Sequence, residues 1–410
     1  MKMKASHGSK DLTGLCVGIV FSFVNFSMIV PLVPLMVNEL GGSPSLLGVL
    51  MSVTSFASLL IAVPSGMMVQ RFGTKKFVIY GSLGLFAGCL MVAAVPSISM
   101  LFIAMPVFWI AQIVIIVAAQ ARVATLGEGR DSSLDFGWYA AATAGGSLFG
   151  PLLAGFLIDT AGHRLTWAAA ALVAGLTCLA FLLFLGNDRS GEEQGIFGFS
   201  FDKNIFKRIF NSLAVAAVVS SFAVIFANGA REVFFPLYLK EIGFSASIVG
   251  VMLSLRAMAS IGVRSVMGVL VKLAGGRFQA LIFSLLCTGI GIGTIPLCKN
   301  LWTLSLNSIV LGFGIGLALP LSMAIIADGV SLPDRGVAMG VRLTGNRLAK
   351  LVNPVFFGTV SQWWSLPAAF WWGGILLFAA TGFLFFWGKT KIKRTGDFAG
   401  GKSVSSKGNQ

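Results

Sequence analysis

Charged side chains occur inside long apolar runs in the second half of this sequence. Within a membrane, each centrally placed cation costs about 2.5–3.5 kcal/mol. Arginine binds carboxylate or phosphate through two hydrogen bonds, and lysine offers a point charge. A single carboxylate cannot neutralise these cations, so we predict that a substrate supplies the missing negative charge. The charged residues of these runs are Arg231, Glu232, Arg256, Arg264, Arg342, Arg347 and Lys350.

Helical spacing places several of these charges on common faces. At about 100° per residue, Arg256, Ser260 and Arg264 share one face of a helix. A second polar arc, about 80° wide by the same rule, occurs in the stretch "VRLTGNRLAKLVNP". It contains Arg342, Asn346, Lys350 and Asn353, with Arg347 beside it.

Depth in the membrane separates two roles for the cations. Arg256, Arg347 and Lys350 are predicted near mid-depth, where we expect them to bind substrate. Arg264 and Arg342 are predicted nearer the cytoplasm, where we expect them to act in gating. For these two, pairing with a carboxylate at that end or with lipid phosphate is the alternative.

Uncharged and acidic polar residues complete the predicted site. Glu232 is the one carboxylate well inside the apolar runs, which makes it the candidate proton carrier. A structural ion pair with a neighbouring cation is the alternative. Asn346, Asn25 and Gln112 are candidate substrate-binding residues. For Asn25 and Gln112, a plain hydrogen bond between helices is the alternative.

The composition predicts the elements that must position these residues. The 410 residues are 56% hydrophobic and only 11% charged, whereas soluble domains have about 25% charged residues. A span needs about 20 apolar residues. We therefore predict an all-α polytopic membrane protein with twelve transmembrane helices, over 13–36, 44–69, 77–95, 99–121, 136–158, 165–185, 210–238, 246–270, 278–297, 301–327, 337–360 and 366–387.

The distribution of lysine and arginine predicts the orientation. These residues concentrate in alternate connections and in the C-terminal tail, and cytoplasmic loops carry such an excess. The net charge of +15 therefore indicates a cytoplasmic membrane surface and lipid contact, not nucleic acid. Both termini are predicted in the cytoplasm of a cell with an inner membrane, and the first apolar run is expected to remain uncleaved.

An internal repeat divides the chain into two halves. "PLMVNELGGSPSLLGVL" from Pro34 and "PLYLKEIGFSASIVGVM" from Pro236 align without a gap at an offset of 202. Later, Pro151 and Pro354 align at an offset of 203. We predict six-helix halves over 1–185 and 210–387, a cytoplasmic linker over 186–209 and a basic tail over 388–410.

The loop after the second predicted span carries a glycine and arginine motif, "GMMVQRFGTKK". It resembles the loop signature of the major facilitator superfamily, with Gln70 where that family has aspartate. The resemblance implies that this loop latches the cytoplasmic gate, with a latch that lacks the usual charge. The matching residues are Gly66, Arg71, Gly73, Lys75 and Lys76.

The fifth predicted span contains "GSLFGPLLAG", which includes Gly150 and Pro151. It resembles a signature of drug and metabolite exporters in the same superfamily, with Ala154 in place of one glycine. Generic packing of small residues is the alternative explanation. The family resemblance covers the whole chain and implies two pseudo-symmetric six-helix halves around a central cavity, working by alternating access.

These observations predict a secondary transporter. The leading hypothesis is proton-coupled export of a small organic anion or an amphipathic anionic metabolite or drug. Import or exchange of such anions, including siderophore-type or carboxylate substrates, is one alternative, and a non-transporting membrane sensor is another. We expect a monomer with no enzymatic activity, cofactor or metal, since no nucleophile–base set, metal cluster or phosphate loop is evident.

Overall fold

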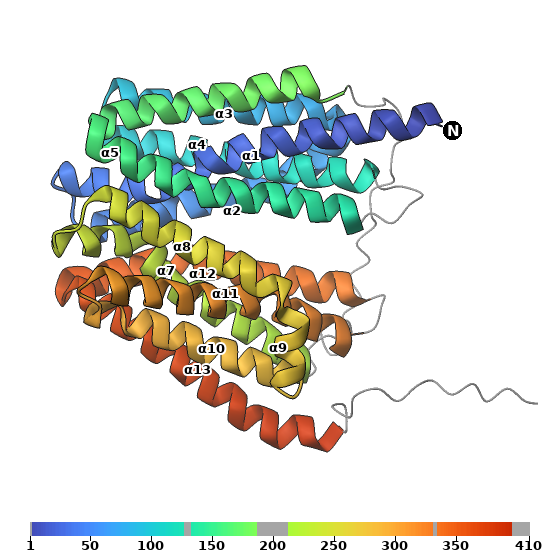
Figure 1. Ribbon diagram of the computed structural model, residues 1–410, viewed down its shortest axis with the longest axis vertical. Coiled ribbons are helices and arrows are strands. Elements are labelled where there is room, and N and C mark those ends of the chain that lie inside the picture. The colour runs from blue at the N-terminus through green and yellow to red at the C-terminus, as the bar shows by residue number, and fades with distance from the viewer. Residues whose placement is uncertain (1, 127–132, 187–211, 331–333, 396–410) are drawn as a thin grey trace, which may run out of the picture.

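Helices make up all the secondary structure that the computed structural model describes, over residues 2–126, 133–186, 212–330 and 334–395. Figure 1 shows them as two stacked groups, α1–α5 and α7–α13. Most of the predicted linker, the end of the predicted tail and the side chain of Gln70 lie outside the described part. The elements are α1 (Lys2–Glu39), α2 (Pro44–Phe72), α3 (Thr74–Ala94), α4 (Ile98–Leu126), α5 (Ser133–Phe184), α7 (Ser212–Glu241), α8 (Ala246–Ser265), α9 (Met267–Leu273), α10 (Arg277–Gly293), η1 (Ile295–Leu297), α11 (Leu301–Gly329), α12 (Arg335–Trp363) and α13 (Leu366–Thr395).

The twelve-helix prediction agrees with this architecture. Within the described residues, nine helices are long and apolar enough to cross a membrane, or ten with the bent pair α9–α10. The 52-residue α5 breaks at Gly162 (φ 75°, ψ 173°) and folds back, so it supplies a second span (Figure 1). The 29-residue α12 is long enough to cross, but its charged residues lower its apolar character. With these two, the span count reaches twelve.

The repeat predicted from the sequence recurs in the turns. The loops before α2 and α8 have equivalent caps: Ser43 accepts the N–H of Leu46, and Ser245 accepts the N–H of Ile248. Gly73, which ends α2, has φ 91°, and its repeat partner Gly275 has φ 83°. Side chains other than hydrogen are strained at such angles, which explains both glycines. The fold is therefore two versions of one helical unit.

The two halves meet along two equivalent seams, α2 against α12 and α5 against α8. Ser52 donates to the carbonyl of Leu351 at 2.7 Å, and Ser254 donates to the carbonyl of Leu148 at 2.6 Å. These bonds are repeat equivalents. Hydroxyl–carbonyl bonds between helices replace contacts that water cannot provide inside a membrane.

Glycines allow the closest approach along both seams. A Cβ added to Gly48 would overlap the carbonyl oxygen of Pro354, and one added to Gly250 would overlap that of Pro151. Each seam therefore brings a glycine of one half against a proline of the other. We define the end of the molecule where these seams lie as the closed end.

Gly250→Val is expected to destabilise the protein by about 1–3 kcal/mol, because overpacked side chains force a shift of the backbone. The measurement is thermal unfolding in detergent. Gly262→Val is the matched control on the same helix, since a Cβ at Gly262 meets no atom within 4 Å. Equal loss in both variants would show that the seam does not depend on the Gly250 contact.

Candidate functional site

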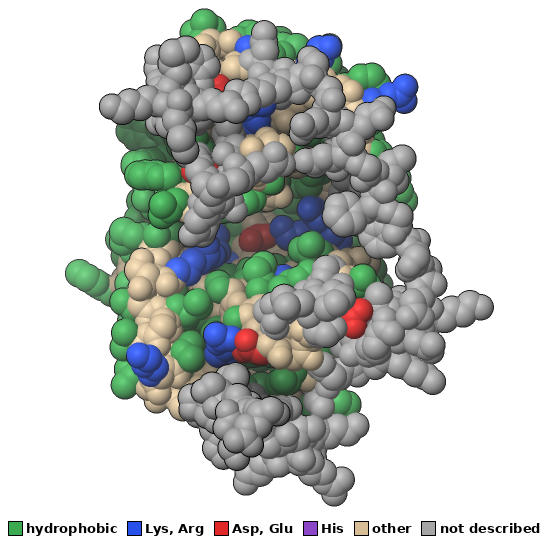
Figure 2. Space-filling view, turned by 90° about the vertical axis from the view of Figure 1, so that its right-hand side faces the viewer, with side chains coloured by type: hydrophobic (Ala, Val, Ile, Leu, Met, Phe, Trp, Pro, Cys, Tyr) green, Lys and Arg blue, Asp and Glu red, His purple; other side chains and the backbone are tan. Residues whose placement is uncertain are grey.

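A hollow lies between the two halves at the end opposite the closed end. Figure 2 views the molecule from the side where α1 begins and α13 ends, which we call the open end. Basic and acidic side chains are visible within the hollow (Figure 2). Polar and ionisable groups at membrane depth face such water-accessible spaces in place of lipid.

The cations of α8 lie on its hollow-facing side. The exposed apolar residues Val251 and Met258 mark the lipid-facing side of α8. Ser254 marks the seam with α5. By helical spacing, Arg256 and Arg264 fall on the remaining side, between the seam and the α11 contact. Arg264 is exposed and Arg256 is half-buried.

The polar arc of α12 also lies on the side of its helix that faces the hollow. Its lipid-facing side carries exposed Leu348 and Val352. Asn353 packs against α7, where it donates to the carbonyl of Ile225 at 3.3 Å. By helical spacing, the exposed Lys350 therefore lies on the side that faces the hollow. Asn346 and Arg347, both half-buried, flank it.

Glu232 on α7 joins this cationic wall. Its Oε1 accepts a hydrogen bond from the side chain of Asn228, one turn earlier, at 2.7 Å. Arg256 lies within electrostatic range of Glu232 and of Arg264. In the described part of the chain, no cation comes within ion-pair distance of Glu232. The carboxylate is therefore held by an amide, and Arg256 has no tight acidic partner.

Arg231 is a residue to which the sequence analysis gave no role. It is fully buried, and its guanidinium lies 4.6 Å from the ring centroid of Phe235. Its NH2 donates to the carbonyl of Met252 on α8 at 3.5 Å, and its Nε and NH1 have no hydrogen-bond partner among the described residues. Arg256 and Glu232 are both within electrostatic range. A helical wheel separates Arg231 from Glu232, which is why spacing alone did not link it to the site.

Arg342 makes its contacts within its own half, and its predicted role in gating stays a prediction. It is fully buried, and its Nε donates to Ser322 at 3.0 Å while its NH2 donates to the carbonyl of Leu319 at 3.2 Å. Both partners are on α11 of the same half. Asp328, a carboxylate at the same end of the molecule, forms an ion pair with Arg277. Arg342 thus links two neighbouring helices and makes no contact between the halves in the described structure.

The polar candidates of the first half make contacts between helices. Asn25 is fully buried and donates to the carbonyl of Ala170 at 2.6 Å. Gln112 accepts from Ser22 at 3.1 Å, while its Nε2 has no partner. The alternative that the sequence left open, an interhelical hydrogen bond, is therefore what the structure has at both positions. The unpaired Nε2 keeps a donor available at Gln112.

Comparison with known proteins identifies the family of this chain. The model of the family described as Major Facilitator Superfamily matches residues 15–297 and 217–407. The chain belongs to this superfamily. It is therefore a multi-pass membrane protein, and members of the superfamily are transporters that bind small-molecule substrates.

Two curated relatives are named for resistance to drugs. Multidrug resistance protein 1 of Bacillus subtilis (strain 168) is 26% identical over 244 residues, which are 59% of this chain and 62% of that protein. The match thus spans less than two thirds of that relative. Quinolone resistance protein NorA of Staphylococcus aureus (strain COL) is 19% identical over 362 residues, 86% of this chain and 90% of NorA.

Solved structures of the superfamily have the same fold. A bacterial homologue of the human lysosomal transporter Spinster, in an inward-facing and unoccupied conformation, gives a TM-score of 0.75 at 14% identity, with coverage of 94% of this chain and 98% of that one. The nucleoside transporter NupG gives 0.75 at 13%, covering 93% and 99%. The human organic anion transporter MFSD10 gives 0.63 at 17%, covering 92% and 99%.

The superfamily loop motif lies between α2 and α3 at the open end. Gly73 supplies the positive φ noted above, and a Cβ added to Gly66 would meet Val117 at an ordinary van der Waals distance of 3.9 Å. Arg71 is exposed, and its guanidinium lies 5.3 Å from the ring centroid of Phe72. Lys75 is half-buried at the start of α3. The structure therefore supports the turn that the motif predicts and leaves its gating role a prediction.

The exporter-like motif provides close crossings on both sides of α5. A Cβ at Gly150 would lie 2.6 Å from the Cβ of Ser27 on α1, and Pro151 meets Gly250 of α8. The packing of small residues that was the alternative explanation for this motif is therefore present. One motif thus joins α5 to its own half and to the opposite half.

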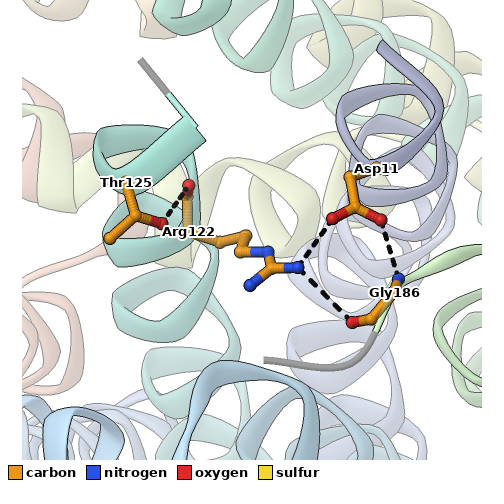
Figure 3. Close-up of polar contacts among 4 residues, drawn as sticks. All are labelled: Asp11, Arg122, Thr125 and Gly186. Carbon is orange, nitrogen blue, oxygen red and sulfur yellow. Dashed lines mark hydrogen bonds and ion pairs between the residues drawn. The ribbon is translucent and has the colours of Figure 1, made fainter. Parts of the chain in front are cut away.

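A polar cluster secures the first half at the open end. The Oδ2 of Asp11 accepts from Arg122 NH2 at 2.7 Å, and its Oδ1 accepts the backbone N–H of Gly186 at 2.9 Å (Figure 3). Thr125 donates to the carbonyl of Arg122 at 2.9 Å. The bonds of Asp11 and Arg122 tie α1 and α4 to Gly186, two residues beyond the end of α5, where the predicted linker begins.

Proposed function

We propose that this superfamily member is a proton-coupled exporter of small organic anions, working by alternating access. The observation that carries the proposal is the excess of cations over carboxylates where α7, α8 and α12 face the hollow. Arg256 and Lys350 would bind the anionic group, with Arg347 and Asn346 beside them. Because cations at membrane depth are costly, an anion that neutralises them binds favourably.

Export is proposed from the names of the relatives and not from the geometry. Two curated relatives are named for resistance to drugs, and export of the drugs from the cell would explain such resistance. With both termini in the cytoplasm, as the charge distribution predicts, the hollow would open inward and collect substrate there. The same cavity could serve import, so the experiment must measure both directions.

Glu232 is the proposed proton carrier. A substrate or proton moves the equilibrium between two conformations only if it binds one of them better. Glu232 lies within electrostatic range of Arg256 and accepts a hydrogen bond from Asn228, so adding a proton changes the charge balance of the site. Such a change can favour one conformation of the loaded or empty transporter.

The test is transport in proteoliposomes with an imposed pH gradient. Naphthalenesulfonate, its uncharged sulfonamide and naphthylmethylammonium share one ring system, and the sulfonate stays ionised across the usable pH range. We expect gradient-dependent transport of the sulfonate and little of the other two. Lys350→Ala should reduce sulfonate transport severalfold, while Lys350→Arg retains most of it. Equal transport of all three compounds would refute anion selectivity, and no transport of a broad anion panel would favour a sensor.

A further inference from the structure

The two seams of the closed end differ at one pair of equivalent residues. Asp159 follows the exporter-like motif on α5, and the same offset of 203 places Gln362 at the equivalent point of α12. Asp159 contacts the first turn of α8, while Gln362 makes no hydrogen bond to α2 in the described structure. The neighbouring contacts of the two seams are repeat equivalents, so the two seams differ at the position of Asp159 and Gln362.

Asp159 binds backbone donors across the boundary between the halves. Its Oδ1 accepts the N–H of Ala246 at 3.0 Å, and its Oδ2 accepts the N–H of Ser247 at 2.7 Å. The next donor, the N–H of Ile248, is satisfied by Ser245 within α8. A carboxylate at a helix N-terminus gains from charge-assisted hydrogen bonds and from the helix dipole. The start of α8 is thus capped by the opposite half.

The α2 seam has no equivalent donor pair. Pro44 stands where α8 has Ala246, and proline has no backbone N–H. Proline at the first helical position removes a donor that would otherwise need a partner. The N-terminus of α2 therefore has one backbone N–H fewer that needs an acceptor. The N-terminus of α8 has this N–H, and Asp159 of the opposite half accepts it.

We propose that Asp159 is a latch that holds the closed end shut and makes the conformation seen here the resting state. Its bonds join α5 to α8, which belong to different halves, so they exist only while the closed end is closed. An interaction present in one conformation shifts the equilibrium by its own free energy. The latch acts through α8, the helix that carries Arg256, and is independent of the chemistry of the substrate.

The proposal also assigns an order to opening. The α5–α8 seam has two charge-assisted bonds at its end that the α2–α12 seam lacks. The α2–α12 seam should therefore separate at lower cost. Separation of the α5–α8 seam then becomes the step that limits opening of the closed end.

Asp159→Asn tests the latch, because asparagine keeps the shape but has one acceptor oxygen and no charge. Val95, which follows α3, and Trp302, at the start of α11, are exposed at the closed end of the molecule. Spin labels at these two positions report the distance between the halves by double electron–electron resonance. The five native cysteines are replaced by serine in every sample. We expect the ratio of open to shut closed ends to rise at least tenfold in Asp159→Asn, and Asp159→Glu to remain near the parent ratio.

Two further variants make the result decisive. Gln362→Ala, at the equivalent position, should leave the distance distribution unchanged. Ala246→Pro copies Pro44 and removes one of the two donors while Asp159 stays, so it should shift the ratio in the same direction. If Asp159→Asn does not fold, Ala246→Pro tests the latch in its place. An unchanged distribution in folded Asp159→Asn or Ala246→Pro would overturn the proposal, as would an equal shift in Gln362→Ala.

Discussion

Arg256→Ala is expected to lower the transport of an organic anion about 30-fold at limiting substrate concentration. A hydrogen bond to a charged group contributes about 2 kcal/mol, and 1.4 kcal/mol corresponds to about a factor of ten in binding. Arg256 lies on the hollow-facing side of α8, and its Nε has no partner in the described structure. It is therefore free to bind an incoming anion without first breaking an ion pair.

The measurement is initial uptake of naphthalenesulfonate into proteoliposomes, with the amount of reconstituted protein matched. Arg256→Lys should lie between the parent and the alanine variant, because lysine retains the charge and loses the two-pronged geometry. Arg264→Ala is the control, since this exposed arginine shares the face of Arg256 two turns toward the open end. If Arg256→Ala and Arg264→Ala reduced transport equally, Arg256 would have no special place in the site.

The fold was predictable because its signals are local or repeated. Apolar runs of membrane length predicted the spans. The offset of 202 aligns Gly73 with Gly275, and both glycines have a positive φ. The same offset relates Gly48 to Gly250 at the seams. What the sequence could not show is which helices pack on each face. The seams depend on contacts between residues far apart in the chain, such as Ser52 and Leu351.

The site was predictable in part for the same reason. Arg256 and Arg264 lie on one continuous helix, α8, so their spacing places them on one face. Spacing does not reveal the neighbour that a face meets. Arg342 lies in the same polar arc as Lys350, yet it is buried against Ser322 of α11. The packing of α11 on α12 determines this partner. The spacing of residues within α12 alone does not predict which helix packs against it.

Charged side chains that bind the main chain were the hardest to foresee. Arg231 is adjacent to Glu232 in sequence but points toward α8, where it reaches the carbonyl of Met252. Asp159 falls at the end of an apolar span and was assigned no role, yet it binds two N–H groups of α8. Main-chain donors and acceptors are present at every residue, so residue types alone do not indicate such bonds.

Glu232→Gln is expected to abolish the response of transport to a pH gradient. Glutamine is uncharged at every accessible pH, so a proton can no longer change the charge beside Arg256. Glutamine also retains a carbonyl oxygen that can accept the hydrogen bond from Asn228, which preserves the local structure. The variant should therefore still bind anions and still exchange labelled for unlabelled anion across the membrane.

Two measurements separate these effects. Gradient-driven accumulation should fall at least tenfold in Glu232→Gln, while anion exchange at equal pH on both sides should stay within about twofold of the parent, since a neutral isostere costs little when its hydrogen bond is kept. Asn228→Ala is the matched control, because it removes the amide that holds the carboxylate and leaves the proton carrier in place. It should retain gradient dependence at a reduced rate. Gradient-driven accumulation at the parent level in Glu232→Gln would move the proton site elsewhere, and loss of exchange would show that Glu232 serves binding itself.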